Sequence, residues 1–149
     1  MKKTSLIFLA ILVAILSACG GPQREALQEN RTLWESQPIQ HYRFNLKIGC
    51  NCPWGDMMPL TIEVQAGEIL SMTASNGADI TTYLQSFRPY GTIESLFDTV
   101  DSAISRRVYK LDVAYDEKYG FPASIIINPS RAVFDDEKGY YVTNVEFLP

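Results

Sequence analysis

Two segments in the first half of the chain alternate between apolar and polar residues. In residues 42–48 the apolar side chains occupy the even positions, and in residues 60–65 the same alternation recurs. A turn at Ala66 and Gly67 leads into a third segment, residues 68–74. A period of two indicates a strand with one buried face. We therefore predict three consecutive strands.

Helical spacing marks two other segments. Residues 22–37 are mostly good helix formers and stop at Pro38, which cannot continue a helix. After Thr92, apolar residues recur every three or four positions, and the threonine hydroxyl can accept a hydrogen bond from a free amide of the first turn. The apolar residues that we expect to form one buried stripe are Ile93, Leu96, Phe97, Val100 and Ile104.

Three further strands are predicted after this second helix, at residues 109–115, 122–128 and 140–147. The order is then helix–strand–strand–strand, twice, and residues 42–46 parallel residues 109–113 in sequence. Short links between successive strands favour antiparallel pairing. We therefore expect an α+β fold of two helix–strand–strand–strand halves, with an antiparallel sheet and both helices packed on one face.

The N-terminus has the layout of a bacterial lipoprotein signal peptide. Lys2 and Lys3 precede an apolar run from Leu6 to Leu16, and small residues then lead to Cys19. A helix of that run is about 16 Å long, roughly half the hydrocarbon core of a bilayer, so the run does not predict a membrane span. We predict cleavage before Cys19 and lipidation of its thiol. The alternative is an ordinary secretory signal with a chance cysteine.

This interpretation divides the chain into three parts: a signal peptide at residues 1–18, the lipidated cysteine with a short tether at residues 19–21, and a single α+β domain at residues 22–149. Acyl chains on Cys19 would anchor the protein in the bacterial cell envelope, at about 0.8 kcal/mol per buried methylene. Gly20 is not the aspartate that retains lipoproteins in the inner membrane of Gram-negative cells. The outer membrane is therefore favoured in such a cell.

Charge narrows the range of partners. The chain has 13 basic and 17 acidic residues, a net charge of −4. Cleavage before Cys19 removes Lys2 and Lys3, which leaves 11 basic residues and a net charge of −6. A surface of that sign repels phosphate backbones, so we expect no nucleic-acid partner.

The sequence offers no catalytic constellation. His41 is the only histidine, and its alternation with Tyr42 places it on the polar face of the first strand. Nothing in the sequence places a serine or cysteine nucleophile beside it. Zinc-protease, phosphate-loop and dinucleotide-binding motifs are also missing from the sequence. We therefore expect a protein that is not an enzyme and that needs no cofactor.

The most distinctive segment is Cys50-Asn51-Cys52-Pro53. Outside the cytoplasm two such neighbouring cysteines usually oxidise. Residues two apart in a regular strand have Cα atoms about 6.6 Å apart, so a disulfide between Cys50 and Cys52 needs a kink, which Pro53 could favour. Two alternatives stay open: a pair of reduced thiols, or a Cu(I) site in which Met57 and Met58 add thioether ligands.

Trp54 follows this segment between a proline and a glycine. Two placements are open: an exposed anchor for a partner, or a side chain that folds back over the open edge of the sheet. We take Trp54, Met57 and Met58 as candidate binding residues. An exposed apolar patch around Trp54 would favour a binding role.

These motifs together resemble a family of small bacterial lipoproteins with a domain of unknown function. The resemblance rests on Leu33-Trp34-Glu35-Ser36, on the Cys-x-Cys-Pro segment, on Tyr115-Asp116 and on Gly120-Phe121-Pro122. It implies an anchored extracytoplasmic domain and supplies no activity. The doubled layout is also similar to periplasmic inhibitor and assembly-factor domains that bind proteins, by fold-level analogy. We expect a protein-binding module; periplasmic thiol or Cu(I) handling through Cys50 and Cys52 is the alternative.

Overall fold

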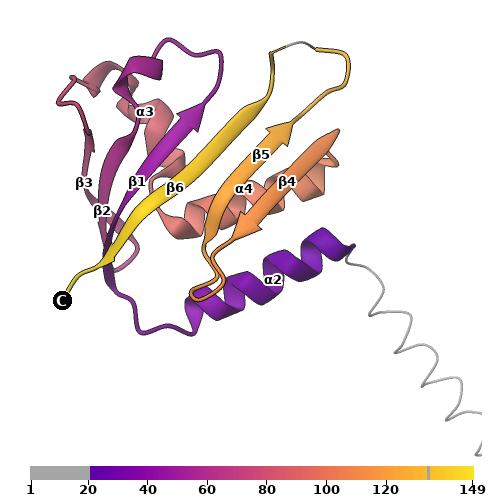
Figure 1. Ribbon diagram of the computed structural model, residues 1–149, viewed down its shortest axis with the longest axis horizontal. Coiled ribbons are helices and arrows are strands. Elements are labelled where there is room, and N and C mark those ends of the chain that lie inside the picture. Colours follow the sequence, from indigo (N-terminus) through magenta and orange to yellow (C-terminus); the bar gives the residue numbers. More distant parts are fainter. Residues whose placement is uncertain (1–20, 134) are drawn as a thin grey trace, which may run out of the picture.

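The protein has a mixed α/β fold built on one antiparallel sheet (Figure 1). The computed structural model describes residues 21–133 and 135–149. The predicted signal peptide and Cys19 lie outside these residues. Within the described residues, no helix is both long enough and apolar enough to cross a membrane.

The predicted helices and strands are present, with small shifts at their ends. The long helices are α2 (Pro22–Glu35) and α4 (Ile93–Arg106), and the short helix α3 (Leu84–Phe87) lies between them in sequence. The strands are β1 (His41–Gly49), β2 (Leu60–Gln65), β3 (Glu68–Ala74), β4 (Lys110–Tyr115), β5 (Pro122–Asn128) and β6 (Lys138–Phe147).

The six strands form one sheet in the order β3-β2-β1-β6-β5-β4. Both halves of the chain therefore contribute to the same sheet, joined where β1 pairs with β6. Residues 42–46 and 109–113, which are similar in sequence, therefore lie in different surroundings, because β1 is a central strand and β4 is an edge strand. Tyr42 is 2% exposed, whereas Tyr109, its counterpart in sequence, is 56% exposed.

Local chemistry explains where α4 begins and ends. The Thr92 hydroxyl accepts a hydrogen bond from the Ser95 amide at 3.0 Å, and the Ser95 hydroxyl accepts one from the Thr92 amide at 3.1 Å, which together form a capping box. At the other end, Arg107 has φ 52° and ψ 51°, a left-handed conformation usually taken by glycine. A side chain in this conformation costs roughly 1–2 kcal/mol.

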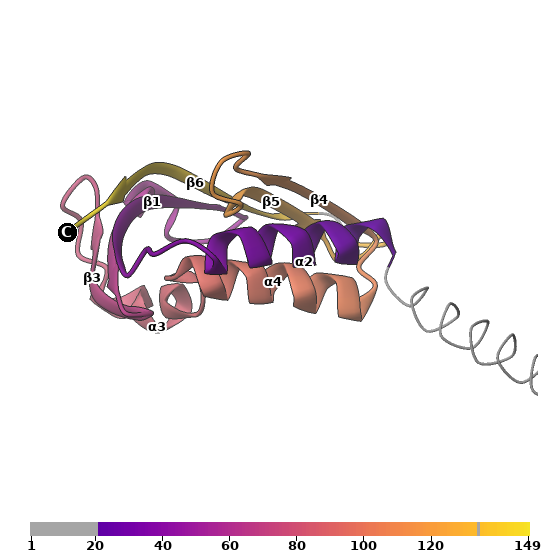
Figure 2. The same ribbon diagram turned by 90° about the horizontal axis from the view of Figure 1, so that it is seen from below.

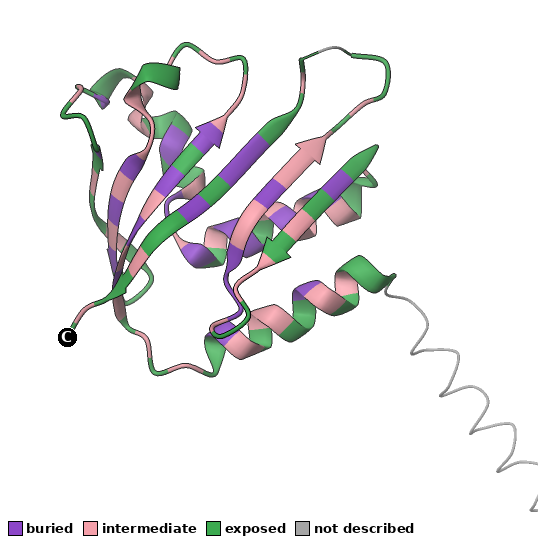
Figure 3. Cartoon of the chain, in the orientation of Figure 1, coloured by how far each residue is buried: buried purple, intermediate pink, exposed green. Residues whose placement is uncertain are grey.

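The core lies between α4 and the sheet, and Figure 3 shows buried positions on both. The predicted stripe is buried at Ile93, Leu96, Phe97 and Val100. The structure differs at the end of the stripe, where Ala103 is buried and Ile104 is half-buried. Successive side chains of an α-helix point about 100° apart around its axis. At this end of α4 it is therefore residue 103, and not residue 104, that faces the core.

Helix α2 runs beside α4 (Figure 2) and is held there by charged and aromatic contacts. Arg24 pairs with Asp101 at 2.7 Å, and Arg31 pairs with Asp98 at 2.8 Å. The Trp34 indole donates a hydrogen bond to the Glu94 carboxylate at 2.9 Å. The turn between β4 and β5 also approaches α2, because a Cβ on Gly120 would lie 2.5 Å from the Asn30 carbonyl oxygen.

Candidate functional site

Cys50 and Cys52 lie just beyond the end of β1. Their sulfur atoms are placed as a disulfide pair, and their Cα atoms are 5.2 Å apart. The chain bends at Cys50 and Asn51, directly after the last strand residue, Gly49. This bend supplies the kink that the spacing of the two cysteines requires.

The candidate binding residues near this bend pack against the core. The Trp54 ring lies 5.4 Å from the Tyr83 ring and 5.5 Å from the Phe87 ring, measured between centroids. Met57 and Met58 are also half-buried against the core. The Met58 sulfur accepts a hydrogen bond from the Ile48 amide at 3.4 Å. The segment is therefore packed onto the helical region around α3.

Of the two expected placements of Trp54, the contacts favour the side chain that folds back rather than the exposed anchor. It is half-buried and folds back, with its ring packed against Tyr83 and against Phe87 of α3. Its indole nitrogen is buried and has no hydrogen-bond partner among the described residues. The large apolar side chains that are exposed are Leu70, Tyr109, Val133, Tyr141 and Phe147. Of these, Tyr141 lines a hollow together with Cys50 and Asn51.

We predict that Cys50 and Cys52 form a disulfide in the mature protein. Alkylation of the unreduced, aerobically purified protein should leave both cysteines unlabelled, and alkylation after reduction should label both. Mass spectrometry reads the difference. Two labelled thiols without reductant would contradict the prediction, and one equivalent of copper retained by such a protein would favour the Cu(I) alternative. In the described residues, no group of three or more histidine, cysteine or acidic side chains is placed to hold a metal ion.

His41 lies in an ion-pair cluster on the face of the sheet that carries the polar residues of β1. Its Nε2 is 2.9 Å from the Glu63 carboxylate, and its Nδ1 is 3.1 Å from the Pro149 carbonyl oxygen. These hydrogen bonds, the one to Glu63 first, raise the pKa of His41 above 6.5. Both ring nitrogens are therefore engaged with partners other than a serine or cysteine nucleophile.

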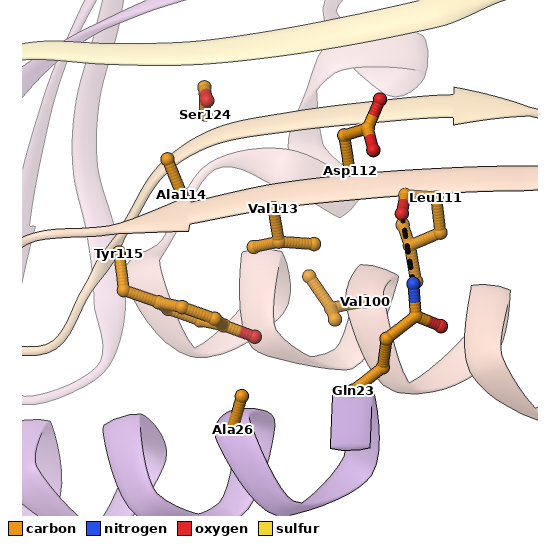
Figure 4. A pocket seen from close by; sticks show the side chains of 9 residues that line it. All are labelled: Gln23, Ala26, Val100, Leu111, Asp112, Val113, Ala114, Tyr115 and Ser124. Carbon is orange, nitrogen blue, oxygen red and sulfur yellow. Dashed lines mark hydrogen bonds between the residues drawn. The ribbon is translucent and has the colours of Figure 1, made fainter. Parts of the chain in front are cut away.

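A pocket of about 350 Å³ runs along β4 and faces α2 (Figure 4). Five consecutive residues of β4, from Leu111 to Tyr115, line one side of it. Gln23 and Ala26 of α2 line the other side, and Val100 of α4 lies behind. We call this pocket the edge groove. Side chains of successive strand residues point to opposite faces, so a pocket that all five residues touch lies at the edge of the strand.

The backbone of β4 faces the edge groove at alternate residues. The Gln23 side-chain amide donates a hydrogen bond to the Leu111 carbonyl oxygen at 2.9 Å, drawn in Figure 4. That carbonyl therefore points away from β5, the only strand with which β4 pairs in the described sheet. Backbone groups of alternate residues point to the same side of an antiparallel strand. The amide and carbonyl of Val113 accordingly face the groove as well.

The Tyr115 hydroxyl adds a second polar group to the edge groove. Figure 4 shows it between β4 and α2. It is buried and has no hydrogen-bond partner among the described residues. Burial raises the pKa of Tyr115 to about 12, so the hydroxyl stays protonated at neutral pH and can donate a hydrogen bond. A buried polar group without a partner is uncommon in native proteins.

A second, larger hollow of about 600 Å³ lies between α4 and the strands β5 and β6. Its lining combines apolar side chains with the charged groups of Arg106, Lys138 and Asp98. Tyr140 and Tyr90 also line this hollow, with their ring centroids 4.8 Å apart. Burial and a hydrogen bond with Tyr90 raise the pKa of Tyr140.

The sequence pattern did not identify the residues of the edge groove. It predicted a strand over residues 109–115, but local periodicity does not tell which strand lies at the edge of a sheet. The sequence also did not indicate that α2 forms part of the groove, because neither Gln23 nor Ala26 belongs to a recognisable motif. One feature of the sequence does indicate an edge strand: β4 is short and contains charged residues, which are common on edge strands.

Comparisons with known proteins place the chain in a family. No curated protein and no solved structure matches it. The resemblance noted above is confirmed at the level of a family without an assigned function. Because the family of unknown function DUF6174 matches residues 26–147, which is most of the chain, the protein belongs to that family.

Proposed function

We propose that the protein is a membrane-anchored extracytoplasmic lipoprotein that binds a partner protein rather than catalysing a reaction. The bound part of the partner is an extended segment that adds to β4 in the edge groove. The observation that carries the proposal is the free edge of β4, which lines a pocket and whose backbone groups at Leu111 and Val113 face away from β5. Such an edge is a ready template for another strand.

The anchor rests on the order of features at the N-terminus. A cationic start, a short apolar run and Cys19 precede Pro22, the first residue of α2. The domain would therefore stand close to the membrane, and the partner would be another protein of the cell envelope. Acyl chains on Cys19 hold the protein at the bilayer, in the outer membrane of a Gram-negative cell.

The proposal treats α2 and α4 as one layer on one face of the sheet, the arrangement that the sequence predicts. The Arg24–Asp101 and Arg31–Asp98 pairs support it, because they join the two helices along their length. In this arrangement α2 forms the wall opposite β4. An incoming strand would then pair with β4 on one side and contact Ala26 on the other.

The chemistry of the edge groove fits a polypeptide better than a charged small molecule. Its walls are mainly apolar, with Ala26, Val100 and Val113 among the lining residues. The polar groups that face it include the Val113 amide and carbonyl and the Tyr115 hydroxyl, and the side chains of Gln23, Asp112 and Ser124 also line it. Main-chain hydrogen bonds would supply affinity, and the apolar walls would select side chains of the partner.

The test uses a displayed library of random peptides, selected on the mature protein. A selected peptide should shift the backbone amide signals of Leu111 and Val113 in NMR spectra and slow their hydrogen exchange. Val113→Pro removes the amide that faces the groove and leaves the ladder to β5 intact, because Val113 points away from β5. We expect it to weaken peptide binding roughly two- to tenfold, the range for one lost hydrogen bond.

Two further variants make this test decisive. Val113→Thr keeps the backbone amide and nearly the same shape, so it should bind the peptide more tightly than Val113→Pro does. Ala26→Trp fills the groove from α2 and should abolish binding even if Val113→Pro fails to fold. Selected peptides that leave the Leu111 and Val113 signals unchanged would overturn the proposal. A dimer that forms with rising concentration and is blocked by Ala26→Trp would assign the groove to a second copy of the chain.

A further inference from the structure

We propose that Gln23 is a removable cap on the edge groove, which a partner strand must displace before it can pair with β4 at Leu111. The inference rests on the proposed function, because it concerns how the same groove is regulated. It goes beyond that function by assigning an autoinhibitory contact to one side chain. In the free protein the cap bonds to the edge of β4, and in the complex the partner takes its place.

The position of the Gln23 amide is the first observation. It donates a hydrogen bond to the Leu111 carbonyl oxygen at 2.9 Å, and the two residues lie 88 positions apart in the chain. A strand that pairs with β4 at this point would donate a backbone amide to the same oxygen, at a distance of about 2.9 Å. The Gln23 amide therefore stands where the amide of a partner strand would stand.

The Gln23 side chain and a partner strand also compete for the same space. Neighbouring strands of a sheet run about 4.8 Å apart, so a partner would fill the space directly beside the Leu111 carbonyl. The Gln23 side chain crosses this space from α2, at one end of the groove (Figure 4). A partner backbone can therefore lie beside Leu111 only if the Gln23 side chain moves away.

Gln23 can move away without any movement of α2. Glutamine has a long and flexible side chain, and Gln23 is exposed. The start of the helix is fixed by other residues: Pro22 is its first residue, and Arg24 donates hydrogen bonds to Asp101 at 2.7 Å and to Ser105 at 3.2 Å, both on α4. Rotation of one side chain into the solvent is therefore enough to open the groove at Leu111.

The strength of the cap decides how far it opposes binding. One neutral hydrogen bond favours the closed arrangement roughly two- to tenfold. The apparent affinity for a partner falls by about the same factor, because only the open arrangement can pair at Leu111. An uncovered strand edge is prone to pair with other chains. A cap of this strength disfavours such weak pairing, and a partner that fits the whole groove still binds.

The experiment uses the mature protein and a selected peptide that shifts the amide signals of Leu111 and Val113. Gln23→Met keeps the length of the side chain and removes the donor, so the peptide should bind roughly two- to tenfold more tightly in titration calorimetry. Gln28→Met is the matched control. Gln28 is exposed on the same helix and is not a lining residue of the groove, so this variant should leave the affinity unchanged.

Two further measurements support the test. Gln23→Glu keeps the shape of the side chain, and its carboxylate does not donate a hydrogen bond at neutral pH but favours the first turn of a helix. It should also bind the peptide more tightly than the unchanged protein, whereas Gln28→Glu should not. In NMR spectra of the unchanged protein, the peptide should move the side-chain amide signals of Gln23 toward the positions of those of Gln28.

The outcomes separate the cap from the proposed function. A peptide that shifts the Leu111 and Val113 signals but binds Gln23→Met no more tightly than the unchanged protein would overturn the cap alone. Weaker binding to Gln23→Met would overturn it as well and would make Gln23 a contact of the partner. If no selected peptide shifts these two signals, the cap and the proposed function are both wrong.

Discussion

Replacement of Phe97 by alanine is expected to lower the free energy of unfolding by about 3–5 kcal/mol, the range for truncation of a large core aromatic. Phe97 is 1% exposed and sits in the middle of the α4 stripe that faces the sheet. Its ring is stacked on that of Tyr115, with the centroids 6.3 Å apart, and Arg31 lies over it at 5.3 Å. Truncation would therefore leave a cavity between α4, α2 and β4.

Urea unfolding, followed by the fluorescence of Trp34 and Trp54, measures this loss. Ser105→Ala is the matched control on the same helix, because Ser105 is exposed and makes one exposed hydrogen bond with Arg24. It should change the free energy of unfolding by no more than about 0.5 kcal/mol. A loss below about 1 kcal/mol for Phe97→Ala would mean that the helix does not pack on the sheet as described.

The strands were predictable where the chain alternates strictly. In β1 the burial follows the sequence alternation, with Tyr42, Phe44, Leu46 and Ile48 buried. The limits of β2 and β3 agree with the prediction, because Ala66 and Gly67 take left-handed φ values of 51° and 79° that close a two-residue turn. No helix or strand was predicted between residue 74 and Thr92. The short helix α3 in this segment is one turn long and therefore carries no helical period to detect.

The candidate site was harder to predict than the fold, because it depends on contacts between distant parts of the chain. The bend that brings Cys50 near Cys52 is local, and the sequence pointed to it. The edge position of β4 arises from its pairing with β5 alone, and its groove needs Gln23, which lies 88 residues before Leu111 in sequence. Trp54 likewise packs against Tyr83 and Phe87, which are distant from it in sequence. No local pattern encodes these pairings.

Loss of the Cys19 thiol is expected to remove the protein from the membrane. In Cys19→Ser no thioether to diacylglyceryl can form, so lipoprotein processing should stop and no acylated mature chain should appear. Two or three acyl chains give stable anchoring where one gives only marginal binding, so their loss changes an anchored protein into an unanchored one. Detergent phase partitioning and mass spectrometry of the N-terminus measure the change.

The matched control is the double variant Cys50→Ser with Cys52→Ser, which removes the other two cysteines of the chain. It should still be acylated and should still partition into detergent, because these thiols lie after β1 within the folded domain. Acylated mature protein in Cys19→Ser would contradict the lipid anchor. An unacylated Cys19 in the unchanged protein would do so too, and would favour the ordinary secretory signal. Either result would remove the reason to place α2 next to the bilayer.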